Sequence, residues 1–142
     1  MSALGTLVRV HNWALEEKQQ KLAGLQQLAD KLREDLRNAQ EDLDRELKAA
    51  SDSPEGTFAF PTFIAAALER RKKLRETIAD VELAVEAARE EVRAAYEEVK
   101  KYEQARDMDK RRGLARQARR EQTALDELAV EMHRRSRAAH QD

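Results

Sequence analysis

The residue types that most often carry out chemistry are scarce in this chain of 142 residues. It contains no Cys, and Ser occurs only at positions 2, 51, 53 and 136. None of these hydroxyl groups has a His in a plausible arrangement for a catalytic triad. Gly113 stands alone, so no glycine-rich loop is present to hold a phosphate group. We therefore predict no enzyme activity, no catalytic residue, no cofactor and no small-molecule substrate.

The three His residues offer one further kind of chemistry, which is metal binding. His133 and His140 are seven residues apart, a spacing that could align them on one face of a helix. No Cys or carboxylate completes a metal-ligand spacing beside them, so we interpret both as surface residues and predict no metal site. His11 lies within an apolar helical stripe, where a packed or register-setting polar residue is the better interpretation.

The amino-acid composition predicts the kind of secondary structure that positions these residues. Charged residues make up 39% of the chain, against the usual quarter, while aromatic residues make up only 4%. Four Gly and two Pro are too few for a turn-rich β fold. With so few large apolar residues, the chain cannot fill a compact core of several layers. An extended all-α fold is therefore predicted.

The sequence as a whole is suited neither to a membrane interior nor to nucleic acid. Its first residues lack a stretch apolar enough for a signal peptide, and no run approaches the ~18 apolar residues of a membrane span. The 27 Lys and Arg residues nearly balance the 28 Asp and Glu residues, which gives a formal net charge of −1. We therefore expect a cytoplasmic protein with no nucleic-acid partner.

An apolar stripe with alternating three- and four-residue steps runs through the first fifty residues. Positions with this spacing share one face of a helix, as in coiled coils. Polar residues interrupt the stripe at His11, Lys18 and the step near Glu46. A coiled-coil helix over residues 3–50 is therefore predicted. Its stripe consists of Leu4, Val8, His11, Leu15, Lys18, Leu22, Leu25, Ala29, Leu32, Leu36, Ala39, Leu43 and Ala50.

A loop is predicted over residues 51–62, followed by a second helix over residues 63–137. Pro54 lacks a backbone N–H group and Gly56 accepts unusual backbone angles, so helix propagation should stop here. Thr62 is an acceptable N-cap for the second helix. The second helix has its own stripe, which consists of Ala67, Arg71, Leu74, Ile78, Val81, Val85, Ala88, Val92, Ala95, Val99 and Tyr102.

The stripe of the second helix lapses between Arg106 and Gly113 and then resumes in a shifted phase. The shift means that the two halves present different faces, or that the helix bends or frays near Gly113. The resumed stripe consists of Leu114, Ala118, Leu125, Leu128 and Met132.

Two long helices joined by a short polar loop should fold back on each other, each burying its stripe on the other. We predict a single coiled-coil domain over residues 1–142. Its fold is a long antiparallel two-helix coiled-coil hairpin with the second helix overhanging at the C-terminus. The last ~30 residues then have no partner within the chain, from the lengths of the two helices. An apolar stripe left unpaired in water predicts a binding partner.

Charge is distributed unevenly along the second helix. A basic run covers residues 70–73, and residues 106–120 carry seven Lys and Arg against two Asp. Between them, residues 76–103 carry nine acids against four bases. One interpretation is a solvated helical face with pairs four residues apart. The other is a charge-banded rod whose ends dock on acidic surfaces or phosphates, although basic patches without aromatic residues are weak evidence for nucleic acid.

All three Phe residues lie within six positions near the predicted loop. They could form a hydrophobic plug that closes the end of the hairpin. Alternatively they could form an aromatic anchor for a partner, because buried aromatic side chains dominate interface energetics. We favour the anchor, since a narrow coiled coil cannot cover all of them. The cluster consists of Phe58, Phe60, Phe63 and Ile64.

Three segments resemble the FliJ family of the flagellar type III export apparatus. The first is the opening run from Leu4 to Val10, and the second is the Phe-x-x-Phe-Ile-x-x-x-Leu pattern of residues 60–68. The third is the run from Arg119 to Ala129, which is similar to the family's C-terminal Arg-x-Glu-Gln-x-x-Leu-Asp-Glu signature. Together these segments extend the resemblance over nearly the whole chain.

This resemblance implies a stalk protein, similar to the central stalk subunit of rotary ATPases, at the inner face of the cell membrane at the flagellar base. The implied partners are the hexameric flagellar export ATPase, a membrane export gate protein and export chaperones. The residues that we expect to contact the ATPase ring are Arg119, Arg120, Glu121, Leu125, Asp126, Glu127 and Met132. The residues that we expect to contact the export gate are Phe58, Phe60, Phe63 and Ile64.

Three alternatives to a flagellar stalk share some of these features. A stalk protein of an injectisome type III secretion system shares the fold and the role. A generic homodimeric coiled-coil scaffold would pair through the C-terminal stripe. A prefoldin-like chaperone is disfavoured, because residues 51–62 are too short and too rich in Pro for the β-strands that it needs.

Overall fold

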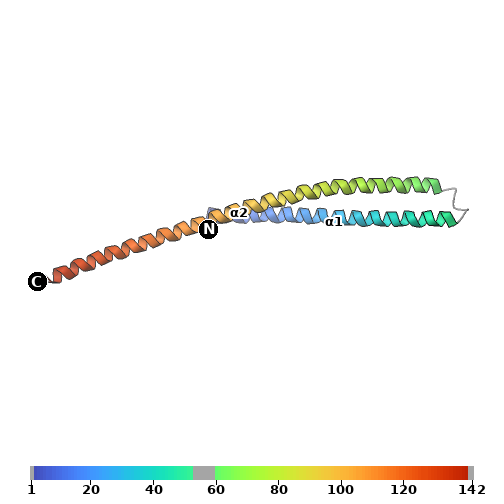
Figure 1. Cartoon of the computed structure of the whole chain (residues 1–142). Coiled ribbons are helices and arrows are strands. Elements are labelled where there is room, and N and C mark those ends of the chain that lie inside the picture. The colour runs from blue at the N-terminus through green and yellow to red at the C-terminus, as the bar shows by residue number, and fades with distance from the viewer. Residues whose placement is uncertain (1, 53–59, 141–142) are drawn as a thin grey trace. The chain divides into compact units, whose positions relative to one another are not determined.

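The computed structural model describes residues 2–52 and 60–140, which form two long α-helices (Figure 1). Helix α1 comprises Ala3–Asp52, and helix α2 comprises Phe60–His140. The described residues contain no β-strand. Both helices are rich in Ala, Leu, Glu, Lys and Arg, which are the strongest helix formers. The predicted all-α two-helix hairpin is confirmed.

The ends of the helices differ from the prediction by a few residues. Helix α1 continues to Asp52, and α2 already begins at Phe60, so Thr62 lies inside α2 and is not its N-cap. The early start is compatible with Pro61, because the first helical turn has no use for the backbone N–H group that Pro lacks. Helix α2 then runs unbroken through Gly113 to His140.

The chain divides into two compact units, which we describe separately. The hairpin unit is His11–Glu97, and the terminal unit combines Met1–Val10 with Glu98–Asp142. In the hairpin unit, α1 and α2 lie side by side and run in opposite directions (Figure 1). Arg33 pairs with Glu82 and Lys21 with Glu91, so advancing along α1 means moving backward along α2.

The core of the hairpin unit is a thin seam formed by the predicted stripes. Every predicted stripe residue of α1 and α2 in this unit is buried or half-buried. A central cluster joins Ala29 with Val81 and Val85, and three half-buried leucines pack against it: Leu22, Leu25 and Leu32. Small side chains in the seam allow the two helices to approach closely, and each one buries little apolar area.

The terminal unit has a short packed region followed by a long exposed one. Val8 and Val99 are buried at 5% and 3% exposure, and Leu4 and Tyr102 are half-buried. From Asp107 to His140 every residue is exposed except Gly113, which is half-buried. Within the described residues, neither helix contains a stretch with the length and hydropathy needed to cross a bilayer.

Candidate partner-binding surfaces

Two Lys residues on α1 hold one carboxylate on α2. The Nζ atoms of Lys18 and Lys21 lie 3.4 Å and 3.3 Å from the Oε2 atom of Glu91. The hydrogen bond from Lys21 and the positive charge of Lys18 lower the pKa of Glu91 below its usual range. Lys18 occupies a seam position, so its ammonium group reaches the edge of the seam while its methylene groups pack inside.

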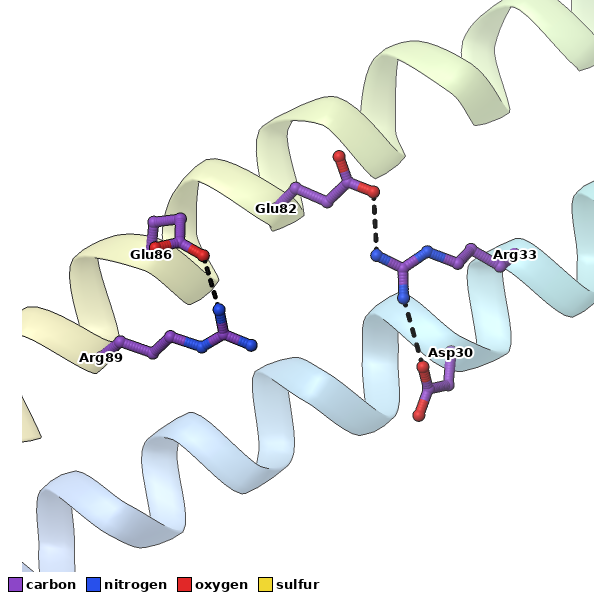
Figure 2. Close-up of polar contacts among 5 residues, drawn as sticks. All are labelled: Asp30, Arg33, Glu82, Glu86 and Arg89. Carbon is purple, nitrogen blue, oxygen red and sulfur yellow. Dashed lines mark hydrogen bonds and ion pairs between the residues drawn. The ribbon is translucent and has the colours of Figure 1, made fainter.

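A second set of ion pairs centres on Arg33, twelve residues after Lys21 along α1 (Figure 2). The guanidinium group of Arg33 donates to Glu82 at 2.8 Å across the helices and to Asp30 at 3.2 Å along α1. The hydrogen bond to Glu82 is the main cause of the raised pKa of Arg33. Farther along α2, Arg89 donates to Glu86 at 2.7 Å.

These side chains form the rim of a groove of about 530 Å³ between the two helices. Ala29 and Val85 line the apolar floor, because a small residue at this seam position leaves space beside the valine. Gln26 completes the set of lining residues together with Asp30, Arg33, Glu82, Glu86 and Arg89. The charges on the rim are already paired within the chain, so the groove offers no free ionic group to fix a ligand.

This groove could not be predicted from the sequence, because it depends on which residues of α1 face which residues of α2.

The contact between Arg71 and Gln40 could not be predicted either, for the same reason. The Nη1 atom of Arg71 lies 2.9 Å from the side-chain amide oxygen of Gln40. Both residues are half-buried, and the pair forms a polar layer in which Arg71 occupies a seam position and Gln40 lies next to the seam residue Ala39. A polar layer of this kind fixes the register of a coiled coil at some cost in stability.

The structure describes only part of the predicted export-gate site. Phe58 lies outside the described residues, and Phe60 is the first residue of α2. The side chain of Phe63 is 44% exposed, and Ile64 is half-buried. Phe63 lines a pocket of about 260 Å³ whose other lining residues are Ala39, Asp42, Leu43, Ala66, Ala67 and Arg70. An exposed aromatic side chain therefore lies beside a partly apolar depression near the start of α2.

The residues predicted to contact the ATPase ring all lie in the exposed part of α2 in the terminal unit. Leu125 and Met132 are 60% and 62% exposed. Leu114 and Leu128, at 67% and 55%, were in the predicted stripe but not in the predicted site. Four large apolar side chains are therefore solvent-exposed along one segment, which is unusual for a surface helix.

Helical geometry divides the predicted ATPase site into two faces. At about 100° per residue, Glu121, Leu125 and Met132 lie on one face, together with Leu114 and Leu128. We call these five residues the C-terminal stripe. The other members of the predicted site lie on the opposite side of α2, and these are Arg119, Arg120, Asp126 and Glu127. A contiguous sequence signature therefore corresponds to two separate surfaces.

Short-range hydrogen bonds support α2 where it has no neighbour in its own unit. The side-chain amides of Gln117 and Gln122 donate to Glu121 and Asp126 at 3.3 Å and 3.0 Å. The hydroxyl group of Thr123 donates to a backbone carbonyl group one turn earlier at 2.9 Å. Contacts between residues four apart stabilise an isolated helix by a few tenths of a kcal/mol each.

Large apolar side chains are also exposed outside the predicted sites. Trp13 is 60% exposed and Leu83 is 72% exposed, both in the hairpin unit and both off the stripes.

The two C-terminal histidines, His133 and His140, are exposed on α2. Among the described residues, no three His, Cys, Asp or Glu side chains are grouped so that they could hold a metal ion.

Comparison with known families decides the identity of the chain. The model of the family described as Flagellar FliJ protein matches residues 1–138. The chain belongs to the FliJ family. The resemblance seen in the sequence is thereby confirmed over its full length, and FliJ proteins are non-enzymatic components of flagellar protein export. No curated protein and no solved structure matches the chain.

Proposed function

We propose that this FliJ-family chain is a stalk that couples the hexameric flagellar export ATPase to the membrane export gate. The observation that carries the proposal is the C-terminal stripe, whose apolar members are each more than half exposed in the terminal unit. Such a surface in water favours a partner that covers it. The chain would act by coupling two binding equilibria, so that binding of the ATPase changes its affinity for the export gate and the reverse.

The two faces of the predicted ATPase site support a partner that surrounds α2. The C-terminal stripe supplies apolar contacts, while Arg119 and Arg120 on the opposite side supply charge-assisted hydrogen bonds to carboxylates. A flat partner would contact one face and leave the other in solvent. A ring would contact both faces at once, which supports the hexameric export ATPase as the partner within the flagellar export apparatus.

The ATPase contact is tested by co-purifying the chain with the flagellar export ATPase of its own organism and measuring ATP hydrolysis with and without it. Leu125→Glu should weaken binding by roughly tenfold or more, because it places a charge where an apolar side chain is buried. Leu83→Glu is the matched control, since Leu83 is 72% exposed in the hairpin unit and lies outside the predicted ATPase site. A chain that ends at Lys110 and binds with full affinity would refute the assignment.

The export-gate contact is proposed for the start of α2. Its support is the exposed ring of Phe63 beside the pocket of about 260 Å³. Replacing Phe60 and Phe63 together by Ala should abolish gate binding and leave the circular dichroism spectrum of the helices unchanged. Leu83→Ala removes an exposed apolar side chain elsewhere on α2 and should leave gate binding unchanged. Equal binding by the Phe variant and the native chain would contradict the proposal.

Binding of export chaperones, and a place at the inner face of the membrane at the flagellar base, are proposed from family membership. Flagellar membership also favours this apparatus over an injectisome or a generic scaffold. Fractionation of flagellated cells tests the location. The chain should leave the membrane fraction when the gate protein is deleted, whereas unchanged membrane association would contradict a gate-dependent location.

A further inference from the structure

We propose that the C-terminal part of α2 pairs with the same segment of a second copy of this chain, in antiparallel orientation. Two adjoining charged bands carry the inference. The basic band, residues 106–120, contains seven Lys and Arg against two Asp. The acidic band, residues 121–132, contains four acids and no Lys or Arg. The chain therefore holds both halves of a complementary surface, side by side and similar in length.

The C-terminal stripe runs along both bands. Leu114 lies in the basic band, while Leu125, Leu128 and Met132 lie in the acidic band, and all four are more than half exposed. An antiparallel partner offers its stripe in reverse order. Leu114 of each copy can then meet Leu125 of the other, which gives one Leu–Leu layer on each side of the twofold axis.

Charge selects this register over the alternatives. A parallel pair in register places the basic band on the basic band. An antiparallel pair centred on Leu125 and Leu128 places the acidic band on the acidic band. An antiparallel pair centred between Arg119 and Arg120 places each basic band on the acidic band of the other copy. Opposite charges across a helical interface stabilise it and like charges destabilise it, which fixes both partner and register.

The hairpin unit shows the geometry that such a pair requires. Lys21 and Glu91 each precede a seam residue, Leu22 and Val92, and they form an ion pair across the helices at 3.3 Å. Lys110 and Glu131 hold the same position in the C-terminal stripe, because Glu131 precedes Met132 and Lys110 lies three heptads before it.

At the register set by the bands, Lys110 of each copy faces Glu131 of the other. Glu131 is exposed and its Oε1 atom lies 3.5 Å from Arg135 on its own helix, an exposed contact that it can exchange or share. The interface thus repeats, between two copies, the ion pair that α1 and α2 form within one chain. Two such pairs flank the leucine layers symmetrically.

Self-pairing covers the same stripe that we assign to the ATPase contact. A second copy and the ATPase would therefore exclude each other, and this consequence alone rests on the proposed function. The dimer itself is measured on the isolated full-length chain. Failure of self-pairing and failure of ATPase binding are thus separate results.

The first test uses sedimentation equilibrium on the full chain and two charge variants. The native chain should pass from one to two chain masses as its concentration rises, with weaker pairing at high salt. Lys110→Glu and Glu131→Lys should each weaken pairing roughly tenfold, because each creates two like-charge contacts. An equimolar mixture of the two variants should restore it, since both contacts of the mixed pair again join a carboxylate to an ammonium group.

The second test locates the register with single cysteines, which the native chain lacks. In the hairpin unit Arg33 and Glu82 each follow a seam residue and meet across the helices at 2.8 Å. Gln122 follows the stripe residue Glu121, and the proposed register places Gln122 opposite Gln122 of the second copy. Ala129 meets its own copy in the register centred on Leu125 and Leu128. A short bismaleimide should therefore link Gln122→Cys chains and not Ala129→Cys chains.

Three results would overturn the inference. These are a single chain mass at every concentration, no recovery in the mixture of charge variants, and preferential crosslinking of Ala129→Cys. Each substituted position is solvent-exposed on α2, so the helical circular dichroism signal should be the same in all variants. That spectrum separates loss of pairing from loss of folding.

Discussion

Shortening Val85 to Ala tests whether the thin seam stabilises the hairpin unit. Val85 is 8% exposed and belongs to the central cluster with Ala29 and Val81. The substitution removes two methyl groups, which contribute about 0.8 kcal/mol each when buried, or about 1.6 kcal/mol in total. A cavity sealed inside the protein would add a further penalty.

That additional penalty should be small at this position. Val85 lines the floor of the groove of about 530 Å³, so the new space joins a depression that is open to solvent. Water can enter the space, and no sealed void forms. We therefore expect a loss of about 1.5 kcal/mol, near the transfer value alone.

The assay is urea unfolding of the full chain, followed by circular dichroism at 222 nm. Leu83→Ala is the matched control, because Leu83 lies on the same helix two residues earlier and is 72% exposed. The control should change the free energy of unfolding by less than about 0.5 kcal/mol. Equal effects of the two substitutions, or a loss of more than about 3 kcal/mol for Val85→Ala, would refute the reasoning.

Three further predictions concern the charges and glycines of the helices. Glu91 has a lowered pKa in the folded chain, so its stabilising effect is present above its unfolded pKa and is lost as the pH falls through the folded value. Between pH 6 and pH 3 the urea midpoint should therefore fall more for the native chain than for Glu91→Gln. Gly24→Ala should raise the free energy of unfolding by about 0.5–1 kcal/mol, since nothing lies within 4 Å of the added Cβ atom. In Gly5→Ala the added Cβ atom meets the Ser2 hydroxyl at 3.3 Å, so thermal melting should show a smaller gain in stability for this variant. Arg33→Ala should shift the urea unfolding midpoint only slightly, because its two ion pairs are exposed to solvent.

The seam could be predicted from sequence because it depends on one variable, the period of the apolar residues. A three-four spacing keeps side chains on one face of any helix, whatever the helix packs against. His11 and Lys18 fitted that spacing and are indeed half-buried, although both are polar. Position in the repeat decides burial here, and the long side chain of Lys18 accommodates it by carrying its charge to Glu91 at the edge of the seam.

Contacts between the helices could not be predicted in the same way. A shift of one heptad between α1 and α2 preserves every stripe and changes every cross-helix partner. The pairs Arg33–Glu82 and Arg71–Gln40, and the groove over Ala29, therefore require the register that the structure supplies. The start of α2 at Phe60 was missed for a local reason, since Pro61 was interpreted as part of the loop although the first helical turn tolerates it.

The C-terminal segment shows how a correct stripe and a sequence signature can describe different surfaces. The signature is contiguous from Arg119 to Glu127, so a helix distributes it around its whole circumference. The stripe selects one face and includes Leu114 and Leu128, which the signature-based site omitted. Sequence similarity selected a contiguous segment, and only helical geometry shows which of its residues can contact the same partner.

Because the C-terminal part of α2 is already helical without a neighbour in its own unit, a partner binds a preformed helix. Isolated helices are marginal in water, and ordering one at the moment of binding consumes part of the interaction energy. Helix α2 meets this cost in advance: it is continuous from the packed region around Val99, and it gains local contacts such as Gln122 to Asp126. Its exposed leucines are then held in one line before any partner arrives. Rigid presentation converts buried apolar area into affinity more efficiently than a disordered tail of the same composition could.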